Sequence, residues 1–168
     1  MQVYGIFPSV KGWVGTAFTE NGIFRLVLPQ PDYLEVREEL LASIGTGWQE
    51  LEEQPYHTDI QKFLAGQCAE LCLPVDWAWA SPFQKEVLQA VQQIPYGQAE
   101  TYGSLAAKLG KPEAVRAVGG ALGRNRVPLV IPCHRVLAAG NKLGGFSSRH
   151  GLQDKVSLLD LEGIAYIL

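Results

Sequence analysis

The sequence predicts two parts of different fold class: an α/β N-terminal domain (residues 1–78) and a mainly α C-terminal domain (residues 79–168) with a winged helix-turn-helix-like element. Three observations lead to this prediction. The first thirty residues alternate short runs of β-branched and aromatic residues with glycine-containing turns. After residue 80, apolar residues recur at helical spacing. The charge also changes sign, because residues 1–80 hold four Lys/Arg and eleven Asp/Glu, whereas residues 81–168 hold ten and six.

The N-terminal part is expected to be a small sheet with two helices and one further strand. We expect the first strands in VYGIF, WVGTAF and IFRLVL, helices at 32–44 and 57–66, and a last strand in CAELCLPV. That last strand would bury Cys68 and Cys72. These residues contain no recognisable catalytic constellation, so we expect the N-terminal part to be structural.

The C-terminal part is expected to begin with a helix near residue 81, where Ser81 and Pro82 suit the N-cap and the first turn. A second helix is expected at 101–109 and a third at 112–123, with Gly110 between them. Two short helices joined by a glycine-containing turn are typical of a helix-turn-helix motif.

The cysteines and histidines predict neither disulfides nor a metal site. The three cysteines are an odd number, and the start of the chain lacks the order of a signal peptide, so we expect reduced thiols in a reducing compartment. The three histidines are scattered, and no second ligand pair stands at a zinc-site spacing. No apolar run approaches the ~18 residues of a membrane span. We therefore expect a soluble, intracellular protein without metal, cofactor or membrane association.

The helix expected at 112–123 has an unusual second face. One face is apolar, and the other carries an arginine and three glycines at positions i, i+3, i+4 and i+7: Arg116, Gly119, Gly120 and Gly123. Each interior glycine costs a helix about 1 kcal/mol relative to alanine, so this face indicates the close approach of another backbone. Two partners fit equally well: DNA, with Arg116 entering a groove or the base stack, or another helix of the protein. The basic residues of 108–126 do not decide between them, because an ordinary solvated face has the same charge.

The segment RNRVPLVIPCHRV contains the strongest candidate for chemistry. A buried strand is expected at 129–131, and Pro132 ends it directly before Cys133. Cys133 precedes His134 and lies in the basic half, where a positive potential lowers the pKa of a thiol. A thiolate nucleophile needs a base and a third group that orients the base. His134 is the candidate base, acting through a water, and Glu162 is the candidate third group.

The stretch IPCHRV is similar to the active-site signature of the O6-alkylguanine-DNA alkyltransferases. The similarity extends through SPFQKEVLQAVQQIPYGQAETYGSLA, AVRAVGGALGRN, GGFS and LLDLEG, and so covers roughly residues 80–165. The N-terminal part matches this family in position and size more than in any motif.

The resemblance implies DNA repair in which a flipped O6-alkylguanine, with O4-alkylthymine as a further candidate, transfers its alkyl group irreversibly to Cys133. His134 would be the water-linked base and Glu162 its orienting group. The residues that would contact the base or the DNA are Tyr102, Arg116, Ala117, Gly119, Asn125, Arg135, Val136 and Ser147. The partner would be double-stranded DNA containing alkylated guanine, bound by a monomer without a cofactor, in the nucleoid-containing cytoplasm of a bacterium or the nucleus of a eukaryote.

Among these, the Tyr102 hydroxyl would lie near guanine N3 and its ring near the phosphate. Arg116 would take the place of the extruded base, from a helix that lies in the minor groove. Asn125 would brace the turn before the active site. The main chain of Cys133 and Val136 and the segment around Ser147 would hold the guanine.

Two departures and two other functions stay open at this point. Arg126 stands where many relatives have proline and suits a phosphate contact, and the loop SSRHG is two residues longer than the common pattern, which leaves the role of Ser147 and the substrate range undecided. A non-reactive lesion binder would lack the acceptor that Cys133 supplies. A cysteine hydrolase using Cys133, His134 and Glu162 would leave the helix with Arg116 and the glycines unexplained.

Overall fold

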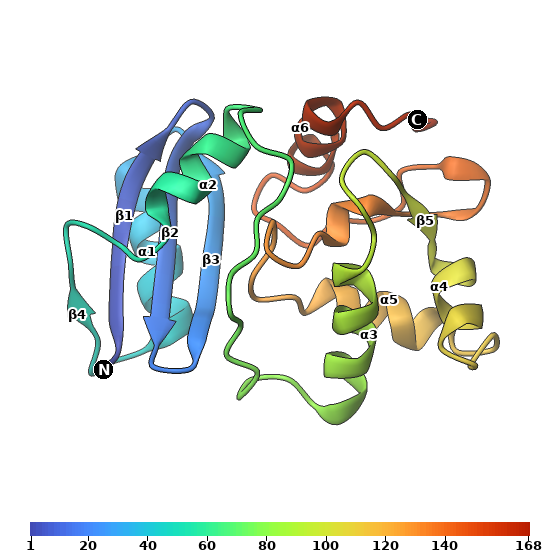
Figure 1. Cartoon of the computed structure of the whole chain (residues 1–168), viewed down its shortest axis with the longest axis horizontal. Coiled ribbons are helices and arrows are strands. Elements are labelled where there is room, and N and C mark those ends of the chain that lie inside the picture. The colour runs from blue at the N-terminus through green and yellow to red at the C-terminus, as the bar shows by residue number, and fades with distance from the viewer. The chain divides into compact units, whose positions relative to one another are not determined.

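The computed structural model describes all 168 residues, and the chain forms two compact units (Figure 1). Unit 1 consists of residues 1–79 and 126–130, and unit 2 of residues 80–125 and 131–168. The sequence-based division assigned all of residues 79–168 to one domain, whereas the five residues 126–130 pack with unit 1. None of the helices has the length and apolar character needed to cross a membrane.

Unit 1 is built on the predicted sheet. Strands β1 (Val3–Ser9), β2 (Gly12–Thr19) and β3 (Gly22–Gln30) are antiparallel neighbours, and the short β4 (Gln49–Glu50) pairs in parallel with β1, in the order β3-β2-β1-β4. The register pairs Ser9 with Gly12 and Thr19 with Gly22, so both hairpins turn on two residues. The three strands expected from the sequence are confirmed.

Helices α1 (Tyr33–Ile44) and α2 (His57–Leu64) cover opposite faces of this sheet. Ala17 of β2 packs with Val36 and Leu40 of α1 in one buried cluster. The next residue of β2, Phe18, points to the other face, where its ring lies 5.9 Å from that of Tyr56 at the start of α2. Alternating side chains of one strand thus bind the two helices, as the period of a strand requires.

The expected strand at 68–75 is wrong. Only Val75 makes a bridge, to Ile23, and the rest of the segment is irregular. The main chain at Ile23 bonds to Pro74 O and Asp76 N, and Pro74 itself has no N–H with which to extend a ladder. As a result Cys72 is exposed and Cys68 is half-buried.

Unit 2 contains the predicted helix-turn-helix. Helix α3 (Pro82–Gln92) begins with a capping box of Ser81 and Gln84, and α4 (Tyr102–Lys108) packs against α5 (Val115–Gly123). Gly110, at φ +71°, makes the turn after α4. Helix α5 begins three residues later than expected, because residues 111–114 form a separate turn closed by a bond from Ala114 N to Lys111 O. Helix α6 (Leu152–Glu162) completes the unit.

The strand expected directly before Cys133, at 129–131, is also absent. Leu129 has a left-handed φ of +71°, which interrupts the expected strand at 129–131. Cys133–Arg135 form a single 3-10 turn, and the chain then continues as β6 (Val136–Leu137), which pairs in parallel with β5 (Glu100–Thr101). The turn therefore places three consecutive functional side chains at the entrance to a short strand.

We predict that Gly22→Ala destabilises the protein far more than Gly45→Ala. Both glycines have a positive φ, of +132° and +76°, but a Cβ at Gly22 would lie 2.3 Å from Pro74 O, whereas one at Gly45 would meet nothing within 4 Å. The difference in free energy of unfolding, measured by urea denaturation, should be at least about 2 kcal/mol. If the two variants lose equal free energy of unfolding, residues 74–75 can move away from β3 without loss of stability, and the prediction is contradicted.

Candidate active site on the turn at Cys133

The Cys133 thiol is buried and held by a local network. The N–H of Cys133 donates to Ile131 O over 2.8 Å, and Nδ2 of Asn125 donates to the same carbonyl over 3.0 Å. Burial raises the pKa of Cys133, and this effect outweighs the hydrogen bond from Asn125, the charge of Lys155 and two backbone N–H groups, which lower it. The expectation that the basic half lowers this pKa is therefore wrong, because desolvation dominates. The resting group is a thiol that needs a base.

The candidate base and its carboxylate partner are both buried. Nε2 of His134 lies 3.3 Å from Oε2 of Glu162, a contact without full hydrogen-bond geometry, and Nδ1 of His134 has no hydrogen-bond partner in the protein. Burial lowers the pKa of His134 in spite of the neighbouring carboxylate, so the imidazole is neutral at neutral pH and can accept a proton. Burial alone would raise the pKa of Glu162, but hydrogen bonds and charges from His134 and Arg135 lower it overall. The carboxylate is therefore charged beside a neutral base.

The guanidinium of Arg135, a residue expected to contact the base or the DNA, is hydrogen bonded inside unit 2. Nε lies 3.0 and 2.9 Å from the two carboxylate oxygens of Glu162, and Nη1 donates to Ile94 O over 2.7 Å. The residue is 7% exposed. A buried arginine paired in this way orients Glu162, and through it His134.

Lys155 is a functional residue that the sequence reasoning missed. Its side chain is fully buried, and Nζ donates to the carbonyls of Val136, Leu143 and Gly145 over 2.7, 2.6 and 3.4 Å. Burial lowers the pKa of Lys155 to about 8, and the interaction with Cys133 partly opposes this. A signal was present in the sequence, since Lys155 stands at helical spacing from the apolar Leu158 and Leu159 and lies seven residues before Glu162 on the same face of α6.

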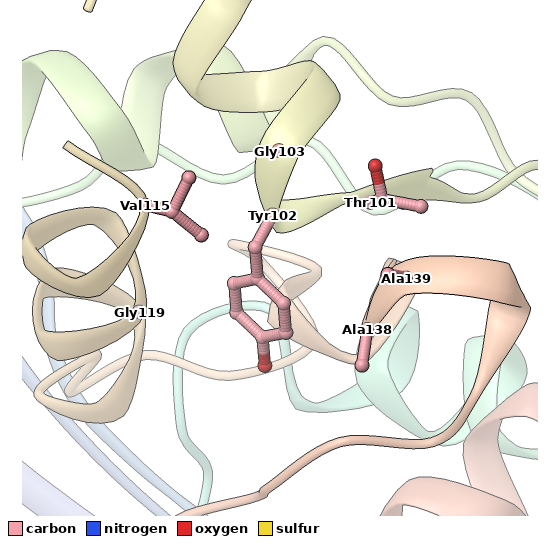
Figure 2. Close-up of a pocket in the computed structure, with 7 residues that line it drawn as sticks. All are labelled: Thr101, Tyr102, Gly103, Val115, Gly119, Ala138 and Ala139. Atoms are coloured by element: carbon pink, nitrogen blue, oxygen red, sulfur yellow. The ribbon is translucent and has the colours of Figure 1, made fainter. Parts of the chain in front are cut away.

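A hollow of about 490 Å³ opens beside Tyr102 (Figure 2). Its walls are formed by small and apolar residues around one aromatic ring: Thr101, Tyr102, Gly103, Val115, Gly119, Ala138 and Ala139. The Tyr102 side chain points from the start of α4 into the space between α5 and residues 138–139. A Cβ at Gly144 would lie 3.3 Å from this ring, so the glycine admits the ring without a clash. Burial raises the pKa of Tyr102, and the nearby Cys133 raises it further. The hydroxyl therefore stays protonated and can donate a hydrogen bond.

The outer face of α5 is open. Val118, Ala121 and Leu122 are buried, whereas Arg116, Ala117, Gly120 and Gly123 are exposed. Val115, the first residue of α5, is 38% exposed and lines the hollow. Gly120 and Gly123 are exposed, and a Cβ at the half-buried Gly119 would come no closer than 4.0 Å to the Tyr102 ring of α4. This favours a partner outside the protein over internal helix packing. A Cβ at Gly123 would lie 3.3 Å from Oγ of Ser147, so the exposed Ser147 borders the same face.

Few of the basic residues at 108–126 are available to a polyanion. Lys108 pairs with Glu100, and Lys111 pairs with Glu86 over 3.0 Å. Arg126 was expected at a phosphate, but it donates to Ser43 O and lies over the ring of Phe24 within unit 1. Arg116 and Arg124 remain as exposed cations without an ion pair.

Comparison with known proteins identifies the family. The model of the 6-O-methylguanine DNA methyltransferase DNA-binding domain matches residues 82–164. A constitutive methylated-DNA–protein-cysteine methyltransferase of Bacillus subtilis is 34% identical over 99% of this chain and 98% of its own length. The chain belongs to the methylated-DNA–protein-cysteine methyltransferase family. A member from Methanosarcina acetivorans is 35% identical over 95% of this chain and 97% of its own length.

The fold of this family member agrees with solved structures. An O6-methylguanine methyltransferase of Mycobacterium tuberculosis aligns with a TM-score of 0.75 at 30% identity, over 96% of this chain and 93% of the other. A structure of the M. tuberculosis protein in complex with DNA aligns at 0.76 and 30% identity, over 95% and 91%. An O6-methylguanine-DNA methyltransferase of Pyrococcus kodakaraensis aligns at 0.71 and 27% identity, over 98% and 100%. The α/β unit and the helix-turn-helix unit predicted from the sequence are both present.

We predict that Lys155→Met raises the pKa of the Cys133 thiol. The positive charge of Lys155 favours the thiolate, so its removal shifts the pH dependence of Cys133 alkylation by iodoacetamide to higher pH and slows the reaction at neutral pH. Peptide mass mapping separates Cys133 from the exposed Cys72 and the half-buried Cys68. Lys142→Met removes an exposed lysine of the same unit and should leave the profile unchanged. Identical profiles for the two variants, both folded, would contradict the electrostatic role of Lys155.

Proposed function

We propose that this protein repairs DNA by transferring the alkyl group of an O6-alkylguanine to the sulfur of Cys133, once and irreversibly. The observation that carries the proposal is the buried group of Cys133, His134 and Glu162, in which a neutral imidazole and its charged partner stand beside a thiol that needs deprotonation. The names of the relatives, which are methylated-DNA–protein-cysteine methyltransferases, support the same reaction here.

The reaction balances without a cofactor. The thiol proton of Cys133 passes to His134, by way of a water that bonds the open Nδ1. The sulfur attacks the alkyl carbon in line, so that a carbon–sulfur bond forms while the bond between that carbon and guanine O6 breaks. Guanine leaves with the electron pair and accepts a hydrogen bond from a donor such as the Tyr102 hydroxyl. The proton that His134 took from the thiol then returns through water to the guanine, which leaves as the neutral base. The product is a thioether, and no group of the site can hydrolyse it, so each molecule repairs one lesion.

Glu162 and Arg135 serve the base. Glu162 stabilises the imidazolium that forms when His134 takes the thiol proton, because its carboxylate is charged and within 3.3 Å. Arg135 holds that carboxylate in place through Nε and Nη2, which both donate to it. In this proposal Arg135 is a positioning residue of the active site.

The guanine is held by main chain and by the loop before α6. The Val136 carbonyl accepts from Lys155 and keeps a second lone pair for the base, so Lys155 fixes the direction of a guanine contact. Ser147 borders the same region beside the end of α5. The same in-line transfer is chemically open to O4-alkylthymine.

The DNA lies along the exposed face of α5. Ala117, Gly119 and the neighbouring glycines allow the helix to approach the minor groove closely, and Arg116 fills the gap left by the flipped base. Asn125 braces the turn after this helix through its bond to Ile131 O. The M. tuberculosis relative has been solved with DNA, which supports duplex DNA as the partner here. The protein acts as a monomer wherever the chromosome lies, in a nucleoid-containing cytoplasm or a nucleus.

We predict a permanent gain in intact mass of one alkyl group per molecule after incubation with duplex DNA containing O6-methylguanine, and peptide mapping should place it on Cys133. Cys133→Ser should gain no mass and still bind the duplex, because the thiol is buried away from the exposed face of α5. Binding by the wild type without any mass gain would indicate a lesion binder. Repeated turnover of an ester or amide, without a stable adduct, would indicate a hydrolase.

We predict that Arg116→Ala slows repair even at saturating protein, because the arginine offsets the cost of base flipping. The loss should shrink for a lesion opposite a mismatch, where the base is already easier to extrude, and vanish with free O6-benzylguanine. Arg124→Ala removes the other exposed arginine of 108–126 without an ion pair and should only weaken DNA binding, which more protein or less salt restores. Single-turnover rates for paired and mispaired lesions are the measurement. Equal saturating rates for Arg116→Ala and wild type would leave Arg116 as a phosphate contact only.

A further inference from the structure

The segment 126–130 leaves unit 2 and becomes part of unit 1 directly before the active site. The Arg126 carbonyl accepts from Leu26 N of β3 over 2.9 Å and from Nη1 of Arg25 over 3.0 Å. The next four residues, 127–130, are all buried. Unit 1 thus binds this segment through the main chain as well as through side chains.

Arg25 is the centre of that attachment. Its side chain is 17% exposed and donates from Nε to Oγ of Ser43 over 3.2 Å and from Nη2 to Glu39 over 3.2 Å, in addition to its bond to Arg126 O. One planar guanidinium therefore ties together β3, α1 and the segment 126–130. The Arg126 guanidinium adds a second attachment, 4.7 Å from the centre of the Phe24 ring.

The segment is also strained where it turns back. Leu129 is 2% exposed with a φ of +71°, a left-handed conformation that is unfavourable for an L-residue with a Cβ. Such a conformation persists only where the surroundings determine it, and it is concentrated at functional sites. Leu129 and its three neighbours in 127–130 are all buried, which supplies that determination.

Both ends of the segment meet at the active site. Asn125 precedes it and Ile131 follows it, and Nδ2 of Asn125 donates to Ile131 O over 3.0 Å. Asn125 also hydrogen bonds with the Cys133 thiol, and the N–H of Cys133 donates to Ile131 O. The two residues that flank the segment are thus two of the groups that hold the nucleophile.

We propose that unit 1 takes part in alkyl transfer through Arg25, a positioning residue that holds the segment 126–130 and thereby fixes Asn125, Ile131 and the Cys133 thiol. The inference rests on the proposed function, since it assigns a role in that reaction. Five residues between two fixed ends have little slack, so a shift at Arg126 displaces the adjacent Asn125. Misplacement of a reacting group by about 1 Å can slow a reaction by up to ~100-fold.

The test compares Arg25→Met with Arg37→Met. Methionine keeps the length and apolar character of the arginine stem and removes every donor. Arg37 lies in the same unit, is 40% exposed, and pairs only loosely with Glu50 at 3.8 Å. At saturating O6-methylguanine duplex, Arg25→Met should transfer the methyl group about tenfold more slowly, with unchanged DNA affinity, and Arg37→Met should match the wild type.

Three further measurements separate positioning from simple loss of stability. The pH profile of Cys133 alkylation by iodoacetamide should shift in Arg25→Met, because the Asn125 hydrogen bond to the thiol is disturbed, whereas a merely structural loss lowers the urea midpoint without moving the profile. Arg25→Lys keeps one donor for Arg126 O and should recover part of the rate. Arg126→Met, which keeps the backbone carbonyl and stays testable if Arg25→Met does not fold, should show a smaller loss of the same kind, not additive with Arg25→Met.

The outcomes distinguish the two proposals. If the wild type transfers the methyl group and both Arg25→Met and Arg126→Met do so at its rate with its pH profile, the positioning role is overturned and the proposed function stands. If the wild type itself acquires no alkyl group from the duplex, the proposed function fails first. A rate loss that is confined to weaker DNA binding, and is cured by more protein, also overturns the positioning role.

Discussion

The active site depends on one buried carboxylate. Glu162 receives His134 from one side and Arg135 from the other, and these are consecutive residues of the turn that begins at Cys133. A turn this short has no regular hydrogen-bond ladder to set its side chains, so the carboxylate sets two of the three. Because breaking a buried ion pair leaves the remaining charge unpaired, this arrangement is hard to distort. The contacts of Glu162 therefore determine both the orientation of the His134 imidazole and the conformation of the turn.

Burial has opposite effects on the ionisable groups of the site, and their combination explains how it can be both stable and reactive. It raises the pKa of Cys133 and lowers those of His134 and Lys155. The resting site thus holds little uncompensated charge away from water. Charge develops only when sulfur loses its proton, and the groups that stabilise it, Glu162 and Lys155, are already in place. Reactivity comes from prearranged partners and not from a standing thiolate.

The sequence was sufficient for features with a strong local signal and insufficient for those set by tertiary structure. Period-two runs and glycine turns predicted the sheet of unit 1, helical spacing and caps predicted α3 and α4, and the order of Cys133, His134 and Glu162 indicated the reactive group. Arg135 and Lys155 were misjudged or missed because long cationic side chains are normally solvated, and only the fold shows the carboxylate and the carbonyls that satisfy them. The predictions of strands at 68–75 and 129–131 were wrong because an apolar run does not show whether a partner strand is available. The packing of residues 126–130 with unit 1 has no signal in the local sequence.

Helix α6 restricts the positions at which the chain can accept insertions or deletions. Lys155 and Glu162 lie seven residues apart, about two helical turns, and both point to the buried side. An insertion or deletion between them would rotate one of the two side chains away from the site, so the number of residues between Lys155 and Glu162 is fixed. The loop before it is free of that restriction, because residues 147–151 can lengthen without changing the spacing on α6. The loop SSRHG can therefore vary in length while Lys155 and Glu162 keep their spacing and their common direction on α6.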